Sequence, residues 1–357
     1  QAKVAHNIMN CKTGAYGANV CVCEDCGFVQ IHYNSCRNRC CPMCQAVPKE
    51  MWMDARREDV LDAPYFHLVF TVPDILNPVI YSNQRLLYDA LYHAASSTIS
   101  ELTADPKHLG AKVGYICILH TWGSEMNFHP HIHTILLGGG LASNNQWKDN
   151  GENFFLPIRV ISKMFRGKYL EELKRLWEED KLVFHGTAEK FRNHYTFKEL
   201  LDSCYGMDWI PHCKKTFNGA QTVIKYLGKY THRIAVSNHR IVRMDDDTVT
   251  FLVKDYRNEG QWKELTISGV EFVRRFLMHV PPRRFVRIRH YGLLCSRTKS
   301  QKLTLCRNLL GCKKYLSKLR DMEMPEILEH LYGIKVCVCK ACGGHLGKPQ
   351  MRMPLRC

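Results

Sequence analysis

The sequence predicts an α+β fold, with a central antiparallel sheet and flanking helices between a small cysteine-rich module and a basic extension. In the central region a strand, an amphipathic helix and two consecutive strands follow one another, an order that favours antiparallel pairing over a doubly wound sheet. Eight of the 18 cysteines lie between Cys11 and Cys44, in a segment too short to bury a core without metal. We therefore expect three domains, covering residues 1–60, 61–298 and 299–357.

The elements of the first half follow from hydrophobic periodicity. A helix after the cysteine-rich segment precedes a buried aromatic strand that Pro73 stops, and an amphipathic helix follows with apolar residues at helical spacing. Two further strands flank a short turn, and the run Gly138-Gly139-Gly140 is expected to end the second of them. The expected ranges are 46–61 for the first helix, 65–71 for the strand, 84–104 for the second helix, and 114–122 and 130–137 for the paired strands.

The second half is expected to be helical at first and then to form a hairpin. Apolar runs alternating with polar residues predict the hairpin strands, and a short helix and a basic segment follow them. The expected ranges are 160–203 (mostly helical), 220–231 (helix), 248–254 and 262–267 (hairpin), 270–278 (helix) and 300–321 (helical and basic).

Charge and composition indicate a polyanionic partner. Lys and Arg total 50 against 34 acidic residues, which gives a formal net charge of +16. Nucleic acid is the usual partner of such a chain. No apolar run reaches the length of a membrane span, so we expect no membrane partner. Clustered CxxC pairs in a large basic chain are typical of zinc in a reducing cytoplasm and not of a secreted disulfide scaffold.

Two CxxC knuckles, Cys23-Glu-Asp-Cys26 and Cys41-Pro-Met-Cys44, are separated by fourteen residues. Four thiolates at this spacing can close a tetrahedral structural zinc site. The remaining cysteines of the segment suit a second, interleaved site, with His32 as an alternative ligand; they are Cys11, Cys21, Cys36 and Cys40. We expect this module to bind DNA.

A further knuckle, Cys339-Lys-Ala-Cys342, lies near the other end of the chain. Cys337, His345 and Cys357 are its potential partners, and a third zinc site is expected there. The alternative is an unliganded tail with one CxxC.

The segment His129-Pro-His-Ile-His133 offers a divalent-metal site. Side chains alternate along a strand, so His131 and His133 share one face. A symmetric turn would set His120 opposite His131, making it the third ligand, with His129 and Glu125 as rivals. Three imidazoles could hold one ion and leave positions open for phosphate oxygens.

Tyr226 and Tyr230 stand at i and i+4, so a helix stacks both phenols on one face. A phenol beside a metal site can attack a phosphodiester and keep the bond energy in a phosphotyrosine. Taken alone, two tyrosines at this spacing are more often core aromatics, and the histidine strand changes that balance. Nearby cations are expected to bind phosphate: Lys225, Lys229 and Arg233 beside the tyrosines, and Arg283, Arg284, Arg287 and Arg289 in the basic segment.

The chain resembles the IS91-type rolling-circle insertion-sequence transposases of the HUH endonuclease superfamily over nearly its whole length. The stretches that carry the resemblance are Cys23–Gly27, Tyr33–Cys44, Tyr65–Pro73, Leu119–Gly123, His129–His133, Tyr226–Arg233, Lys254–Arg257 and Arg287–Gly292. Where relatives often have histidine in the zinc module, this chain has Asn19 and Cys40, which leaves the second site's ligand set open.

The resemblance implies a zinc-binding domain, an HUH nuclease and a C-terminal extension. It implies Mg²⁺ or Mn²⁺ at the histidines, Tyr226 and Tyr230 as nucleophiles, and transposition through single-stranded DNA in the bacterial cytoplasm, close to the nucleoid. The alternatives are a plasmid replication initiator or relaxase with the same chemistry, a DNA-binding protein that has lost catalysis, and a zinc-finger regulator. The last leaves residues 60 to 300 unexplained.

Overall fold

The computed structural model describes residues 1–149, 151, 156–209, 212–217, 222–223, 226, 228, 234–255 and 259–352, with the backbone alone described for 212–217 and 352. None of the helices in these ranges is both long and apolar enough to cross a bilayer. Short 3-10 turns, labelled η, cover Gly14–Tyr16, Asp74–Leu76, Gly186–Arg192 and Asn238–Arg240.

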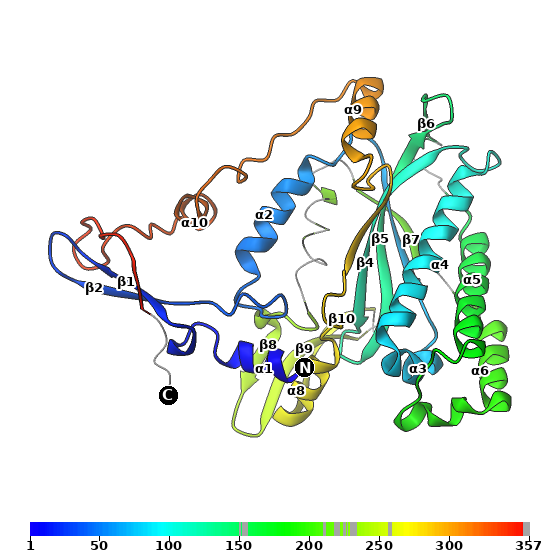
Figure 1. Cartoon of the computed structure of the whole chain (residues 1–357), viewed down its shortest axis with the longest axis horizontal. Coiled ribbons are helices and arrows are strands. Elements are labelled where there is room, and N and C mark those ends of the chain that lie inside the picture. Colours follow the sequence, from blue (N-terminus) through cyan, green and yellow to red (C-terminus); the bar gives the residue numbers. More distant parts are fainter. Residues whose placement is uncertain are drawn as a thin grey trace.

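The central sheet is antiparallel, as the sequence predicts, and it holds the strands expected around the histidine segment (Figure 1). Its described strands run in the order β11-β4-β5-β3-β7, and β6 pairs with β5. Their bounds are β3 Tyr65–Thr71, β4 Lys112–Trp122, β5 Phe128–Leu141, β6 Trp147–Asp149, β7 His212–Phe217 and β11 Ile288–Gly292. β11 was not expected, because its sequence is part of the basic segment.

Four of the described helices cover one face of this sheet, and α2 (Ala46–Arg57) and α9 (Lys299–Leu310) lie on the side of the other face (Figure 1). The covering helices are α3 Asn77–Ser82, α4 Gln84–Ala104, α5 Ile158–Glu178 and α6 His194–Gly206. Phe66, Leu68 and Phe70 of β3 point into the core beneath these helices. The alternate residue Tyr65 instead joins a second core that includes Trp52 and Met53 of helix α2, Ala46–Arg57.

The three consecutive glycines do not end β5, which continues to Leu141. A Cβ on Gly139 would lie 2.4 Å from the Trp147 ring, and one on Gly140 would lie 2.3 Å from the Lys112 carbonyl oxygen. The prediction of a strand end was therefore wrong. The glycines instead let the neighbouring strands approach closely.

A second sheet, in the order β8-β9-β10, lies against the turn between β4 and β5. Its hairpin was predicted, and β10 pairs with β9 along its whole length. The bounds are β8 Ile241–Met244, β9 Thr248–Asp255 and β10 Gln261–Ser268, and helix α8, Gly269–Met278, follows.

The two ends of the chain share a third sheet, in the order β12-β1-β2 (Figure 1). Its strands are β1 Ala18–Val22, β2 Val29–Tyr33 and β12 Gln350–Arg352, and helix α1, Ala2–Met9, precedes them. The predicted helix over 300–321 is too long: α9, Lys299–Leu310, stops at left-handed Gly311, and α10 covers Met324–Tyr332. The last part of the predicted C-terminal extension thus packs with the N-terminal module.

Candidate active site and cysteine clusters

The three histidines expected to hold a metal lie together on the face of the central sheet opposite helices α3 to α6. His120 of β4 pairs with His131 of β5, in the register that a symmetric turn predicts. The nearest ring nitrogens of His120, His131 and His133 all lie within 4.8 Å of one another. The Nε2 atoms of His131 and His133 are 3.1 Å apart. Nitrogens that converge in this way suit one shared divalent ion.

Burial keeps the imidazoles of His131 and His133 neutral, which is the form that binds metal. His120, His131 and His133 are all buried. Burial is the main cause that lowers the pKa of His131 to about 4, and it lowers the pKa of His133 well below its ordinary 6.5. Three neutral imidazoles can bind a divalent ion, and imidazole nitrogen generally prefers softer ions than Mg²⁺.

The two rival third ligands point elsewhere. The Nδ1 atom of His129 lies 3.3 Å from the carboxylate of Asp74, at the rim of the site. Glu125 is held by its backbone, whose carbonyl accepts a hydrogen bond from Arg275. The geometry therefore favours His120 as the third ligand.

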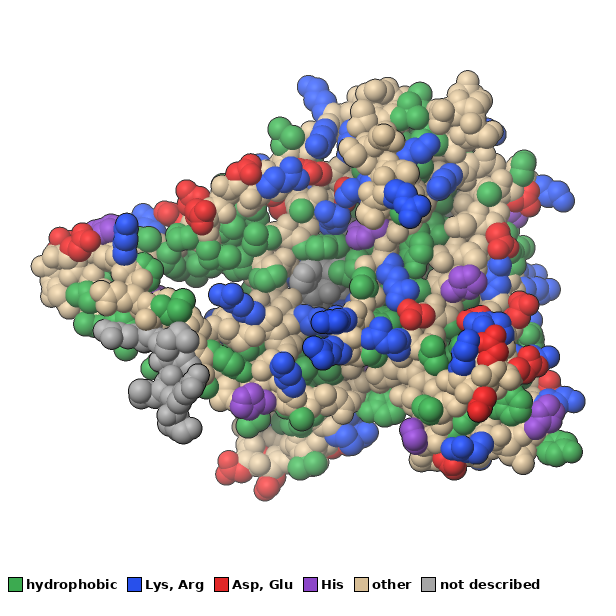
Figure 2. All heavy atoms as spheres, viewed as in Figure 1, with side chains coloured by type: hydrophobic (Ala, Val, Ile, Leu, Met, Phe, Trp, Pro, Cys, Tyr) green, Lys and Arg blue, Asp and Glu red, His purple; other side chains and the backbone are tan. Residues whose placement is uncertain are grey.

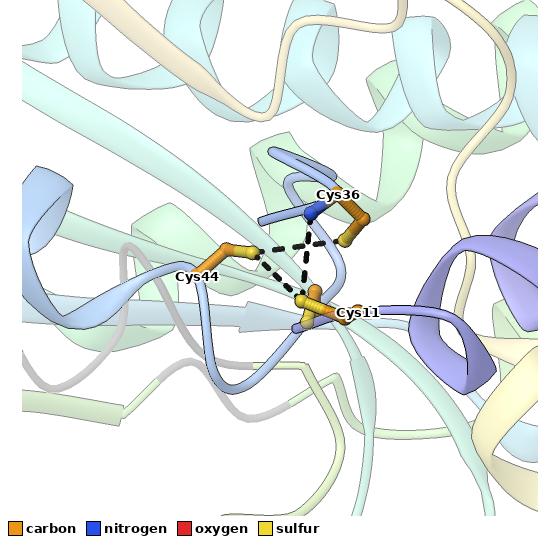
Figure 3. Close-up of side chains that lie close together, drawn as sticks. Cys11, Cys36 and Cys44 are labelled. Carbon is orange, nitrogen blue, oxygen red and sulfur yellow. Dashed lines mark hydrogen bonds between the residues drawn. The ribbon is translucent and has the colours of Figure 1, made fainter. Parts of the chain in front are cut away.

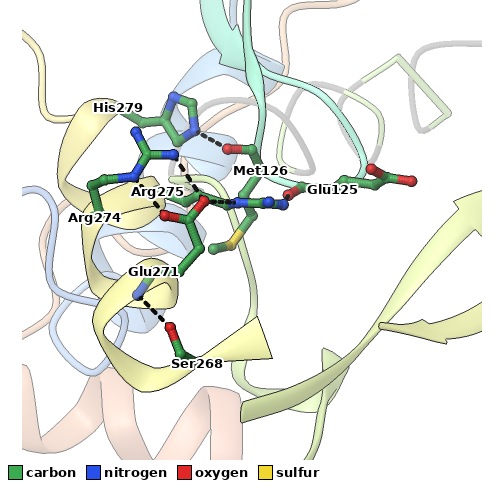
Figure 4. A network of polar contacts seen from close by, with 7 residues as sticks. All are labelled: Glu125, Met126, Ser268, Glu271, Arg274, Arg275 and His279. Atoms are coloured by element: carbon green, nitrogen blue, oxygen red, sulfur yellow. Dashed lines mark hydrogen bonds and ion pairs between the residues drawn. The ribbon is translucent and has the colours of Figure 1, made fainter. Parts of the chain in front are cut away.

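Helix α8 fixes the turn that sets this register (Figure 4). Glu271, near the start of α8, binds both Arg274 and Arg275. The buried His279 donates from Nε2 to the Met126 carbonyl at 3.0 Å, and its Nδ1 accepts from Thr121. These contacts hold the turn from the side opposite the histidine cluster.

His67 of β3 joins the histidine cluster to Tyr226, and the sequence reasoning missed it. Its Nε2 lies 2.9 Å from Nδ1 of His133. The Tyr226 hydroxyl lies 2.8 Å from Nε2 and 2.9 Å from Nδ1 of the same ring. The sequence shows a histidine within the apolar strand Tyr65–Thr71. Its role could be recognised only once the pairing of β3 with β5 was known.

Of the tyrosine segment, the structure describes Tyr226 and places it against the second core. Residues of the same segment that the sequence singled out, namely Tyr230, Lys225, Lys229 and Arg233, lie outside the described residues.

A cavity of about 630 Å³ opens over the histidine cluster and continues onto the second sheet. Trp262 lines it with 55% of its surface exposed. The Lys254 ammonium lies 5.3 Å and the Arg240 guanidinium 5.8 Å from a Trp262 ring centroid. An exposed indole between cations suits a nucleic-acid base and its phosphates.

The four arginines of the basic segment differ in their exposure and contacts. Arg283 and Arg284 are exposed and line a cavity with Lys3, and Figure 2 shows Lys and Arg side chains gathered over the middle of one face. Arg289 instead pairs with Asp89, and the Arg287 guanidinium lies 5.6 Å from the Trp122 ring centroid. Arg287 and Arg289 thus make internal contacts, and their predicted phosphate contacts stay a prediction.

The cysteines form two groups of four, but not the groups that the spacing predicts. In one, the Cys44 sulfur lies 3.4 Å from that of Cys11 and 3.6 Å from that of Cys36, and Cys41 completes the set (Figure 3). Zn–S bonds of about 2.3 Å in a tetrahedron place the sulfurs about 3.8 Å apart. The cluster therefore fits a structural zinc ion.

The second group joins Cys23 and Cys26 to Cys339 and Cys342. The predicted union of Cys23 and Cys26 with the Cys41 knuckle is corrected, because the C-terminal chain returns to the N-terminal sheet. The other predicted zinc ligands stand as follows: Cys21 packs with Leu346, Cys40 packs with Met126, Cys337 is exposed and in neither group, and Cys357 lies outside the described residues.

Two family models match the chain. One, described as "Transposase zinc-binding domain" and belonging to the IS91 type, matches residues 1–72. The other, described as "Putative transposase", matches residues 114–302. The chain is 39% identical over 345 residues to "Putative transposase y4qJ" of Sinorhizobium fredii, which spans 96% of this chain and 87% of the relative. The chain belongs to the IS91-type transposase family.

A second relative supports this membership. The transposase for insertion sequence element IS801 of Pseudomonas savastanoi pv. phaseolicola is 30% identical over 308 residues, covering 85% of this chain and 72% of the relative. Membership of this family excludes the zinc-finger regulator and separates the chain from plasmid initiators and relaxases.

Solved structures of the conjugative relaxase TrwC in complex with oriT DNA also match. The copper-bound and metal-bound forms are 13% and 14% identical, with TM-scores of 0.25 and 0.26. Each match covers 46% of this chain, and 68% and 69% of the relaxase chains. These scores are too low for the likeness to support an inference about this transposase.

Proposed function

We propose that this transposase is an HUH endonuclease that nicks and rejoins single-stranded DNA, with Tyr226 as the first nucleophile. His120, His131 and His133 would hold one Mg²⁺ or Mn²⁺ ion. The observation that carries the proposal is the continuous contact from the Tyr226 hydroxyl through His67 to His133.

The direction of the hydrogen bonds follows from which nitrogen binds metal. The Nε2 atoms of His131 and His133 face each other, so they are the ligand atoms. A neutral histidine that binds through Nε2 carries its proton on Nδ1. His133 therefore donates to Nε2 of His67, whose own proton then sits on Nδ1, 2.9 Å from the Tyr226 oxygen.

A donor aimed at the phenol oxygen stabilises the phenolate, and so favours loss of the phenol proton to water. The phenolate then attacks the phosphorus, and the bond to the 3′ oxygen breaks. The 3′ oxygen takes up a proton, and the 5′ phosphate stays on the tyrosine. A bound divalent ion would neutralise charge on the scissile phosphate. Attack by a free 3′ hydroxyl on the phosphotyrosine reverses these steps and rejoins DNA.

Tyr230 is proposed as the second nucleophile, one helical turn after Tyr226. A second phenol would accept the next strand before the first is released. This part of the proposal rests on the sequence spacing and the family.

The DNA strand is proposed to enter over the second sheet. Trp262 would stack on a base, and Lys254, which lies directly opposite it on β9, would bind the adjacent phosphate. Both line the cavity that contains the histidines. The exposed Arg283 and Arg284 would bind more distant phosphates, which positions DNA without reading its sequence.

The test is single-turnover cleavage of single-stranded DNA that carries the sequence flanking the transposase gene, at a series of Mn²⁺ concentrations. His131→Ala and His120→Ala should each shift the Mn²⁺ dependence to higher concentration and slow cleavage. His129→Ala is the matched control and should cleave as the wild type does. Cleavage by His131→Ala with an unchanged metal dependence would refute the metal site.

A further inference from the structure

The second cysteine cluster draws its four sulfurs from the two ends of the chain. Cys23 and Cys26 follow β1, while Cys339 and Cys342 come more than 300 residues later. We propose that these four thiols bind one zinc ion, which closes the N-terminal and C-terminal segments into a single module. The C-terminal residues 337–352 would dock on β1 only when the metal is bound.

The sulfur geometry fits one zinc ion. The Cys23 and Cys342 sulfurs are 3.6 Å apart, and those of Cys26 and Cys339 are 3.8 Å apart. These are the separations of a tetrahedron with Zn–S bonds of about 2.3 Å. Four thiolates leave no open position, so the site is structural, and binding displaces the thiol protons to water.

Besides backbone hydrogen bonds, few apolar contacts hold the C-terminal segment on the module. The apolar cluster at this place consists of the ligands Cys23 and Cys339 together with Cys21 and Leu346. β12 pairs with β1 over three residues, and Met351, the middle residue of β12, is 68% exposed. A core this small does not order a segment by itself, as in other small metal-dependent modules.

Backbone contacts place the C-terminal segment in register with the N-terminal knuckle. The Glu24 amide donates to the His345 carbonyl at 3.1 Å, and the Gly347 amide donates to the Val22 carbonyl at 2.9 Å. These bonds set the two CxxC loops face to face. The segment is thus positioned by the backbone and secured by the proposed ion.

The other end of the same C-terminal segment is fixed on helix α2. Asp54 accepts hydrogen bonds from Tyr315, from the Ser317 hydroxyl at 2.5 Å and from the Leu319 amide at 3.0 Å. Residues 311–352 therefore form a strap that runs from α9 across α2 to the cysteine cluster (Figure 1). Metal binding at its far end closes this strap.

The consequence is that the N-terminal module is incomplete until Cys339 and Cys342 have been made. The matching zinc-binding family model ends at residue 72 and contains only half of this ligand set. A chain that stops before Cys339 would expose Cys23 and Cys26, while the Cys11 cluster would still load. This inference does not depend on the nuclease chemistry.

The experiment measures zinc per chain and the alkylation of each cysteine in the native full-length protein. The wild type should hold two zinc ions and protect both clusters from N-ethylmaleimide. The double variant Cys339→Ser/Cys342→Ser should hold one ion and expose Cys23 and Cys26, while Cys11 stays protected. The control Cys337→Ser removes a neighbouring thiol outside the cluster and should hold two ions.

A second measurement needs no variant. During slow chelation of the wild type, Cys23, Cys26, Cys339 and Cys342 should lose protection together, at a rate distinct from that of the Cys11 cluster. The proposal is overturned if Cys23 and Cys26 stay protected in the double variant. It is also overturned if, during chelation, they lose protection together with Cys41 and Cys44 and not with Cys339.

Discussion

His67→Leu is the substitution that probes the link between the nucleophile and the metal site. Leucine is similar in size to histidine and removes both ring nitrogens, so the Tyr226 hydroxyl and Nδ1 of His133 each lose a partner. His67 contacts the proposed metal ligand His133, and losing a hydrogen-bond partner of a ligand weakens metal affinity by about 10- to 100-fold. That corresponds to about 1.4–2.7 kcal/mol.

The loss of the donor to Tyr226 should be visible even when metal is saturating. Removing a hydrogen-bond donor aimed at a developing oxyanion slows a reaction by about 10²- to 10³-fold. The assay has two parts: Mn²⁺ binding by calorimetry, and single-turnover cleavage at saturating Mn²⁺. His129→Leu, which removes an imidazole at the rim, should change neither quantity by more than a few-fold.

The result that refutes this reasoning is specific. If His67→Leu binds Mn²⁺ and cleaves DNA within about twofold of the wild type, His67 neither orients His133 nor assists Tyr226. A fall in metal affinity with a normal cleavage rate at saturating Mn²⁺ would show that His67 orients His133 but does not assist Tyr226.

Three further predictions concern the surroundings of the site. Asp54→Ala should lower the free energy of unfolding by about 2–4 kcal/mol, because it removes an acceptor of several hydrogen bonds, whereas exposed Asp62→Ala should have little effect by thermal denaturation. Trp262→Ala should weaken binding of single-stranded DNA by about 5- to 150-fold in fluorescence anisotropy, while Tyr195→Ala, an exposed aromatic on α6, should not. Burial is the main cause that lowers the pKa of His279 to about 4. The unfolded chain therefore binds a proton here before the folded protein does, and the free energy of unfolding falls by up to about 3 kcal/mol as pH falls from 6.5 toward 4. The melting temperature of the metal-free protein should therefore fall over this range, and His279→Gln should make the fall shallower.

Much of the central domain could be predicted because its sequence is locally consistent. The apolar run at Tyr65–Thr71 and the helical spacing over Gln84–Ala104 gave bounds that the structure confirms. His120 pairs with His131 as a symmetric turn predicts, although the register shifts between His120 and Trp122. Local rules sufficed for these elements.

What the sequence could not supply depends on contacts between distant segments. His67 acquires a role only when β3 pairs with the histidine strand β5. The cysteine grouping failed for the same reason, because nearest spacing favours Cys23 with Cys41, while the chain brings Cys339 back to Cys23. The glycines after Leu137 were misread because their function is close approach to Trp147, a residue on another strand.

The central claim is that Tyr226 becomes joined to DNA, and the most direct measurement is to find the residue that carries the nucleotide. The transposase would be incubated with Mn²⁺ and single-stranded DNA from the sequence flanking its gene, then denatured, treated with nuclease and protease, and analysed by mass spectrometry. We expect a 5′-phosphonucleotide on the peptide that contains Tyr226, lost in Tyr226→Phe and absent without metal. An adduct on another residue alone, or metal-dependent cleavage with no adduct, would contradict the account.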